Sequence, residues 1–243
     1  MFIKKILQLF IILFLSATTF INYSFAQSDE LKSLFQSTKS AYKSGELTKA
    51  LSFAKKAIVI SEKEFGLNHK VTGTLISNLG EIQMDLKSFE EAEQTFRESS
   101  KIMYEVLEHY DPAIADSISL LALSLNKQSL FKEAMFYHQE SLIIMSKAIS
   151  RDNPTTHGVN ENTRKAAMYR ARAMFTKAAI EMNNENYESA IGYLKTSVRL
   201  FTTSLGRDKS ELKETYLMML EAAHKAKDQK TIDMAENFIE NFM

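Results

Sequence analysis

Three segments of the chain resemble one another at a fixed 42-residue interval. Each contains an alanine in a similar context: Ala50 in GELTKAL, Ala92 in SFEEAE and Ala134 in LFKEAM. A fixed interval of this length is typical of stacked repeats, in which one unit buries its apolar face against the next. The interval therefore restricts the possible folds more strongly than the length of the chain does.

The second copy shows what one unit is. Two runs of apolar residues with helical spacing lie in residues 75–106, and only Lys87 and Ser88 separate them. The first run is Leu75, Leu79, Ile82 and Leu86, and the second is Phe89, Ala92, Phe96, Ser99, Met103 and Val106. We therefore expect two helices that fold back on each other across a tight turn. Glycine in a helix costs about 1 kcal/mol relative to alanine, so Gly80 predicts a close approach of the partner helix.

Turn residues support the same interval. Asp111 precedes Pro112, and Asn153 precedes Pro154 at the equivalent place of the next repeat. Both pairs are typical helix starts, because the first side chain can cap the helix and proline lacks an N–H that would be unpaired there. His69 stands at the equivalent position of the preceding repeat, which predicts a helix-start role.

These patterns divide the chain into four parts. We expect a signal peptide in residues 1–26, three regular repeats in 27–151, an insertion loop with a helix extension in 152–168, and a fourth repeat with a capping pair of helices in 169–243. The insertion, which could instead be a hinge, follows from Ala190, which stands fourteen positions later than one interval after Ala134. In the last pair, Ala223 and Ala235 resemble Gly80 and Ala92, and irregular spacing is typical of a capping unit.

The N-terminus has the pattern of a secretory signal. Lys4 and Lys5 precede an apolar run over residues 6–15, and small residues at Ser24 and Ala26 predict cleavage before residue 27. An uncleaved membrane anchor is the alternative, but this run is much shorter than a span of about 20 residues. The chain contains no cysteine, which argues against a lipoprotein. We expect an exported protein, periplasmic or secreted, that contacts a membrane only if the segment is retained.

Composition excludes several functional classes. Lys plus Arg and Asp plus Glu both total 30, so there is no basic surplus for binding nucleic acid. Only 7 glycines and 2 prolines occur in 243 residues, which favours long helices and an all-α fold.

The sequence has no phosphate-binding glycine loop, no H-E-x-x-H and no nucleophile elbow. The five histidines lack partners at metal-ligand spacing, and His138 is interpreted as a partly buried packing residue. We expect no enzyme activity, no metal, no cofactor and no small-molecule substrate.

The residues Leu79-Gly80, Ala92 and Phe96 resemble the pattern of the tetratricopeptide repeat (TPR). The 42-residue interval, with connectors such as residues 65–69, 109–112 and 152–154, is similar to the longer repeats of the kinesin-light-chain type. This resemblance implies an α-solenoid of helical hairpins, wound as a right-handed superhelix. It also implies a groove on the concave side that binds peptides or proteins.

The resemblance places the first helix of each hairpin along that groove. One stripe in the second repeat comprises Thr74, Asn78, Glu81 and Asp85, and an asparagine at position 78 is implied to contact a ligand backbone. The candidate groove residues are Lys39, Tyr42, Lys43, Thr74, Asn78, Glu81, Asp85 and Lys127. A solvated helix face is the alternative interpretation of such a stripe. The basic set that binds chaperone tails in many relatives is not reproduced, since Asp116 and Leu120 stand at the required positions.

Together these observations predict an exported, non-catalytic module that binds a partner protein or peptide in its groove. A membrane-tethered structural subunit of a cell-envelope complex is the alternative, and signal cleavage separates the two.

Overall fold

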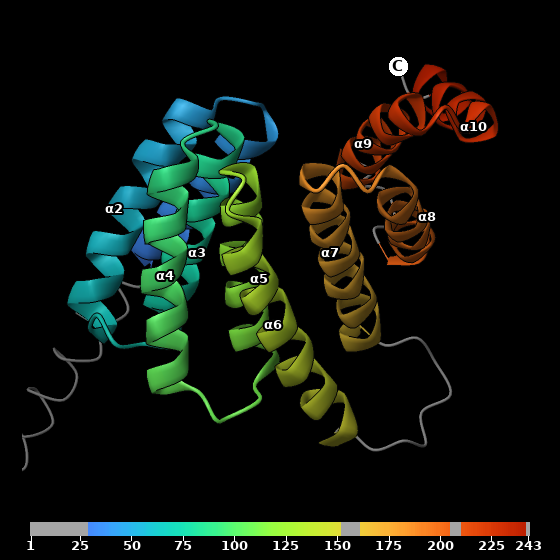
Figure 1. Ribbon diagram of the computed structural model, residues 1–243. Coiled ribbons are helices and arrows are strands. Elements are labelled where there is room, and N and C mark those ends of the chain that lie inside the picture. Colours follow the sequence, from blue (N-terminus) through green and yellow to red (C-terminus); the bar gives the residue numbers. More distant parts are fainter. Residues whose placement is uncertain (1–28, 152–160, 205–209, 242–243) are drawn as a thin grey trace, which may run out of the picture. The chain divides into compact units, whose positions relative to one another are not determined.

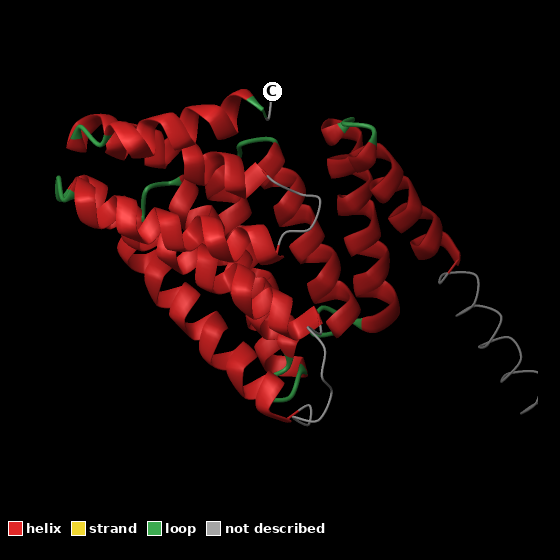
Figure 2. Ribbon diagram, turned by 90° about the vertical axis from the view of Figure 1, so that its right-hand side faces the viewer, coloured by secondary structure: helices red, strands yellow, loops and turns green. Residues whose placement is uncertain are grey.

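The computed structural model describes residues 29–151, 161–204 and 210–241. Every regular element in these ranges is an α-helix (Figures 1 and 2). The predicted all-α class is therefore confirmed. Residues 1–26, with the predicted signal peptide, and the predicted helix start at Asn153-Pro154 lie outside the described residues. Within the described residues, no helix is both long enough and apolar enough to cross a membrane.

The chain divides into two compact units between Lys87 and Ser88. The first contains a helix over residues 29–43, then α2 (Leu47–Phe65) and α3 (Lys70–Asp85). Small side chains dominate its core: Ala50 and Ala54 of α2 pack with Ala41 and with Ile82 of α3. Because alanine projects little from a helix, these three helices pack closely.

The second unit consists of seven helices within the described residues. They are α4 (Phe89–Val106), α5 (Pro112–Lys127), α6 (Phe131–Arg151), α7 (Glu161–Asn183), α8 (Tyr187–Ser204), α9 (Ser210–Ala226) and α10 (Gln229–Glu240). Each helix packs against the next one in the chain, and α5 also packs against α7 (Figure 1). This is the arrangement of stacked helical hairpins, in which first helices meet first helices. Its cores contain Met103, Ile114, Ile118, Met145 and Tyr169 in one cluster, and Ala178, Ala190, Leu194 and Met219 in another.

Each hairpin turn contains one residue in the left-handed region of φ. In the described part of the chain these residues are Gly45, Lys87, Ser129, Glu185 and Lys227, with φ between 57° and 76°. At four of them the next backbone N–H donates to the carbonyl oxygen five residues earlier, as Leu130 does to Leu125 at 2.9 Å. This pattern is the Schellman motif, which satisfies carbonyl groups at the end of a helix. The second helix then begins two residues after the left-handed residue.

These turns correct the predicted register of the last hairpin. Glu185 and Lys227 are again one 42-residue interval apart, so the interval continues through the turn between α9 and α10. The counterparts of Gly80 and Ala92 are therefore Leu220 and Ile232, and the assignment to Ala223 and Ala235 was wrong by three residues. The error arose because the assignment compared small residues, whereas the backbone of the turn sets the register.

Two of the predicted helix starts are confirmed. The Asp111 carboxylate accepts the backbone N–H of Ala113 at 2.8 Å, and Pro112 opens α5. The His69 ring accepts the N–H of Val71 at 3.2 Å ahead of α3. Gly80 is buried in α3, but the helix that it was expected to approach belongs to the other unit, so that contact stays a prediction.

The turn at Gly45 supports a stability test. A Cβ added there would meet no atom within 4 Å, so only the backbone conformation, with φ at +76°, opposes a side chain. We expect Gly45→Ala to lower the free energy of unfolding by about 1 kcal/mol, measured by urea denaturation. Gly192 of α8 is the matched control, because it has equal space and no positive φ. There we expect alanine to raise stability by about 0.5–1 kcal/mol. Equal effects of the two variants would contradict a strained turn.

Candidate functional site

The first unit contains a pocket of about 170 Å³ between the helix over residues 29–43 and α3. The first helix contributes Phe35, Thr38, Lys39 and Tyr42, and α3 contributes Asn78, Glu81 and Ile82. Pockets for whole small-molecule ligands are usually about 300–1,000 Å³. The smaller volume here fits one large side chain of a peptide.

Three of the seven side chains that line the pocket, Phe35, Tyr42 and Ile82, are aromatic or apolar. Ile82 is buried at its base, while Phe35 and Tyr42 are 39% and 38% exposed. The Tyr42 hydroxyl donates to the Asp85 carboxylate at 2.5 Å, and this charge-assisted hydrogen bond holds the tyrosine ring against α3. An apolar side chain entering the pocket would therefore meet surfaces that are already in place.

The rim of the pocket carries an amide and two ammonium groups that have no partner in the part of the chain that the structure describes. The Asn78 amide makes no hydrogen bond within the described residues, so it can both donate and accept. Lys39 and the exposed Lys43, one turn further on, form no ion pair in the same ranges. The rim thus offers an amide that can bind a peptide backbone and two ammonium groups that can attract a carboxylate, beside the Glu81 carboxylate that also lines the pocket.

The eight predicted groove residues fall into three groups. Lys39, Tyr42, Asn78 and Glu81 line the pocket, and Asp85 contacts it through Tyr42. Lys43 and Thr74 are exposed beside it, and the Thr74 hydroxyl donates to the Lys70 carbonyl oxygen of its own helix at 2.9 Å. Lys127 belongs to the second unit, where its ammonium pairs with Glu214 of α9. Five of the eight therefore meet around one pocket, and their role in binding stays a prediction.

Three pocket residues were not predicted from the sequence: Phe35, Thr38 and Ile82. The predicted residues Lys39 and Lys43 stand one interval before Glu81 and Asp85. A stripe chosen by this shift of one interval passes over the adjacent face of the first helix. Phe35 and Tyr42 are seven residues apart, on one face of a helix. Two large aromatic residues on a partly exposed face were the signal that could have located the pocket.

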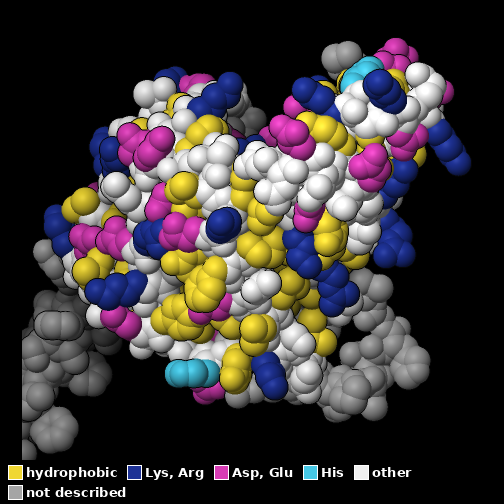
Figure 3. Space-filling model, viewed as in Figure 1, with side chains coloured by type: hydrophobic (Ala, Val, Ile, Leu, Met, Phe, Trp, Pro, Cys, Tyr) yellow, Lys and Arg dark blue, Asp and Glu magenta, His cyan; other side chains and the backbone are white. Residues whose placement is uncertain are grey.

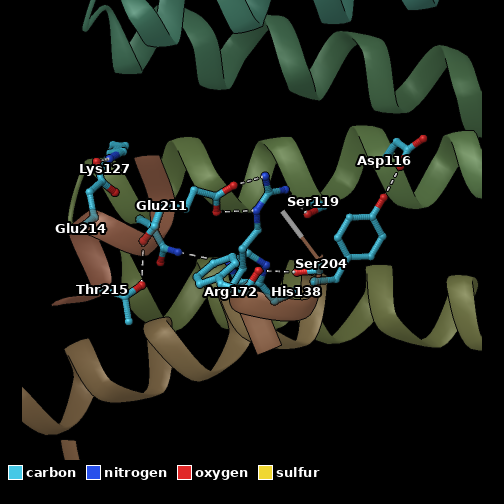
Figure 4. Close-up of polar contacts among 12 residues, drawn as sticks. Asp116, Ser119, Lys127, His138, Arg172, Ser204, Glu211, Glu214 and Thr215 are labelled. Carbon is cyan, nitrogen blue, oxygen red and sulfur yellow. Dashed lines mark hydrogen bonds and ion pairs between the residues drawn. The ribbon is translucent and has the colours of Figure 1, made fainter. Parts of the chain in front are cut away.

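In the second unit, the polar residues of the first helices bind one another. The Arg172 guanidinium of α7 donates to both carboxylate oxygens of Glu211, at 2.8 and 2.6 Å, and to the Ser119 hydroxyl at 2.9 Å (Figure 4). Asp116 accepts from Lys165 at 2.7 Å and from the Tyr169 hydroxyl. These contacts join α5, α7 and α9, so the polar face predicted as a groove on α5 is largely satisfied from within the chain.

A buried hydrogen-bond cluster lies beside this row. The Asn126 amide bonds to the Thr176 hydroxyl at 2.8 Å and contacts the His138 ring at 3.2 Å. His138 is fully buried, more so than predicted, and burial together with the Arg172 charge lowers its pKa to about 3. The ring is therefore neutral at physiological pH. No group of acidic residues, histidines or cysteines within the described ranges could hold a metal ion.

Comparisons with known proteins match this architecture. The tetratricopeptide repeat family matches residues 74–102. TPR-like repeats named after kinesin light chain, from Podosopora anserina, are 14% identical with a TM-score of 0.56, over 85% of this chain and 92% of that chain. The apo form of RapI is 18% identical, with a TM-score of 0.59 over 88% of this chain and 69% of its own.

A Rap protein complexed with competence and sporulation factor is 13% identical, with a TM-score of 0.56 over 88% of this chain and 63% of its own. No curated protein gave a significant match. Identities this low establish the fold, and the family match identifies the repeat. The fold is one that is typically non-catalytic and serves as a scaffold for protein interactions. The chain is therefore a protein of TPR-like helical repeats, in which residues 74–102 match a tetratricopeptide repeat.

Proposed function

We propose that the chain is an exported, non-catalytic module that binds a partner protein through the pocket of its first unit. The observation that carries this proposal is the pairing of a partly apolar pocket with the Asn78 amide at its rim, which has no hydrogen-bond partner within the described residues. An extended peptide needs both features, because its backbone must keep its hydrogen bonds while one side chain is buried. The solved Rap protein with this fold was bound to competence and sporulation factor, which supports a binding role.

The partner segment should carry one large apolar side chain with an acidic residue beside it. Phe35, Tyr42 and Ile82 would contact the apolar group, and Lys39 and Lys43 would attract the carboxylate. The acidic residue would act mainly on the rate of association, because charges exposed at a rim steer an encounter more than they strengthen the complex.

Selection of peptides from a random library tests this proposal. We expect peptides that bind the chain to share one apolar residue and to lose at least about tenfold in affinity with Tyr42→Ala or with Asn78→Ala, measured by calorimetry. Phe65→Ala is the control, because Phe65 is an exposed aromatic of α2 that does not line the pocket. Peptides that bind wild type and both pocket variants equally would show that the pocket is not the binding site.

Export is the second part of the proposal, and it rests on the pattern of residues 1–26. N-terminal sequencing of the protein recovered from its own cells is expected to begin at Gln27. A chain that keeps Met1 and sediments with membranes would contradict cleavage and favour the membrane-tethered alternative.

A further inference from the structure

An ion pair in the second unit joins two helices that are not neighbours in the stack. The Lys127 ammonium, at the end of α5, pairs with the Glu214 carboxylate of α9 (Figure 4). The hairpin of α7 and α8 stands between them in the chain, and α9 packs closely against α8 and α10. Repeats of a solenoid normally contact only the next repeat. Simple stacking of hairpins therefore does not account for this pair.

The helices on the Glu214 side of the pair form one packed block. A single apolar cluster contains a residue from each of α7, α8, α9 and α10, namely Ala178, Leu194, Met219 and Ile232. Acidic and basic side chains lie close together on the surface over α9 and α10, which suits a hairpin with one face toward solvent (Figure 3). The ion pair thus ties the hairpin of α5 and α6 to the whole block of α7–α10.

The hairpin of α5 and α6 packs unevenly against this block. In the first half of α7, Tyr169 is fully buried in an apolar cluster with Ile118 and Met145. At the end of α7, a cavity of about 380 Å³ lies between the α5–α6 turn and residues such as Ile180 and Asn183. One end of the interface is therefore closed by apolar packing, whereas the other end has space for movement.

Polar groups hold the interface between these two ends. The Asn126 amide donates to the Thr176 hydroxyl at 2.8 Å, and both side chains are buried. Beside them, the Nδ1 atom of the His138 ring is buried with no hydrogen-bond partner within the described residues. A buried polar atom without a partner destabilises the arrangement that buries it. The closed interface therefore carries a cost that hydration of this atom would remove on opening.

The two ion pairs that reach α9 differ in exposure. The side chains of Lys127 and Glu214 are 29% and 45% exposed. Those of Arg172 and Glu211, which pair inside the block, are 9% and 18% exposed. Salt screens exposed charges much more than buried ones. The Lys127 pair can therefore be weakened under conditions that leave the Arg172 pair in place.

We propose that the hairpin of α5 and α6 and the block of α7–α10 move relative to each other about the apolar cluster at Tyr169, and that the Lys127–Glu214 pair is the clasp that holds them closed. Along α7, Thr176 lies seven residues from Tyr169 and Asn183 lies fourteen, which is about 10 and 21 Å. An opening of about 2 Å at Thr176 therefore widens the cavity at Asn183 by about 4 Å. A carboxylate from another molecule would compete with Glu214 for Lys127 and open the clasp.

Double electron–electron resonance between two spin labels tests the clasp. The chain contains no cysteine, so Lys132→Cys at the start of α6 and Glu188→Cys at the start of α8, both exposed, give unique attachment sites. We expect Lys127→Met to raise the ratio of open to closed forms about two- to fivefold at low salt. The open form should show a label distance about 4 Å longer. Lys225→Met is the matched control, because Lys225 is exposed on α9 and forms no ion pair within the described residues.

Salt and charge exchange supply the outcomes that decide the proposal. At about 1 M salt, where the screening length falls to about 3 Å, wild type should open as Lys127→Met does at low salt, and that variant should no longer respond. Combining Lys127→Glu with Glu214→Lys should restore the closed form. The same label distance in wild type and Lys127→Met, at low and high salt, would overturn the clasp. Loss of helical circular dichroism at high salt would overturn it too, because the unit would then unfold rather than open.

The experiment uses neither a peptide nor the pocket of the first unit. A failure of the clasp is therefore distinguishable from a failure of the proposed function.

Discussion

Arg172→Met is expected to lower the free energy of unfolding of the second unit by about 3 kcal/mol. Arg172 is 7% exposed, and its guanidinium donates to both oxygens of Glu211 and to the Ser119 hydroxyl. Without the arginine, a carboxylate that is only 18% exposed would keep its charge with no partner. Loss of one member of a buried pair costs about 3–5 kcal/mol, and the partial exposure of Glu211 favours the lower end. Urea denaturation followed by circular dichroism measures the change.

Two further variants show whether the buried charge is the cause. Combining Arg172→Met with Glu211→Leu removes both charges, so most of the lost stability should return. Arg170→Met is the matched control, because Arg170 is exposed two residues away on the same helix. Its effect should stay within about 0.5 kcal/mol. A double variant as unstable as Arg172→Met alone would contradict the assignment to an unpaired charge.

Acid is expected to destabilise the chain through His138. Its pKa in the folded state is about 3, because burial and the nearby Arg172 charge oppose protonation, whereas an unfolded histidine titrates near 6.5. The unfolded state therefore binds one more proton than the folded state between these two values. The stability contributed by neutral His138 is complete above pH 6.5, and it falls by up to about 1.4 kcal/mol per pH unit as the pH drops toward 3.

The histidine contribution can be isolated by substitution. His138→Gln removes the titrating group and keeps a polar side chain that can bond to Asn126. Its free energy of unfolding should depend less steeply on pH between 6.5 and 4 than that of wild type. His224→Gln is the matched substitution control, because His224 of α9 is exposed. Parallel curves for wild type and His138→Gln would rule out His138 as the source of acid sensitivity.

Features that depend on residues close together in sequence could be predicted. The helix starts at His69 and Asp111 follow from local capping chemistry, and the hairpin turns follow from the 42-residue interval. The last hairpin was misaligned because Lys227 adopts a left-handed backbone conformation and thereby sets the turn. A lysine in a sequence does not indicate this conformation. Only the backbone showed that the interval continues.

Contacts between distant helices could not be predicted in the same way. Lys127 was assigned to a groove, but it pairs with Glu214, which lies 87 residues later. Arg172 and Glu211 have no sequence signature that links them, since many charged pairs at similar separations never meet. The pocket was located in part, because Asn78 and Glu81 follow the repeat pattern. Phe35 was not predicted, because the shift by one interval from Glu81 and Asp85 selects the lysine stripe of the first helix and not the face that carries Phe35.

Photo-crosslinking at residue 35 tests the central claim most directly. The photoreactive analogue p-benzoylphenylalanine would replace Phe35, and irradiation of the cells that make the protein would join the pocket to its occupant. We predict that one defined partner is captured at residue 35. This capture should be lost when Tyr42→Ala and Asn78→Ala are combined. It should also be absent when the analogue replaces Phe65, which is exposed and does not line the pocket. Capture of the same proteins from residues 35 and 65, unaffected by the pocket variants, would contradict binding in the pocket.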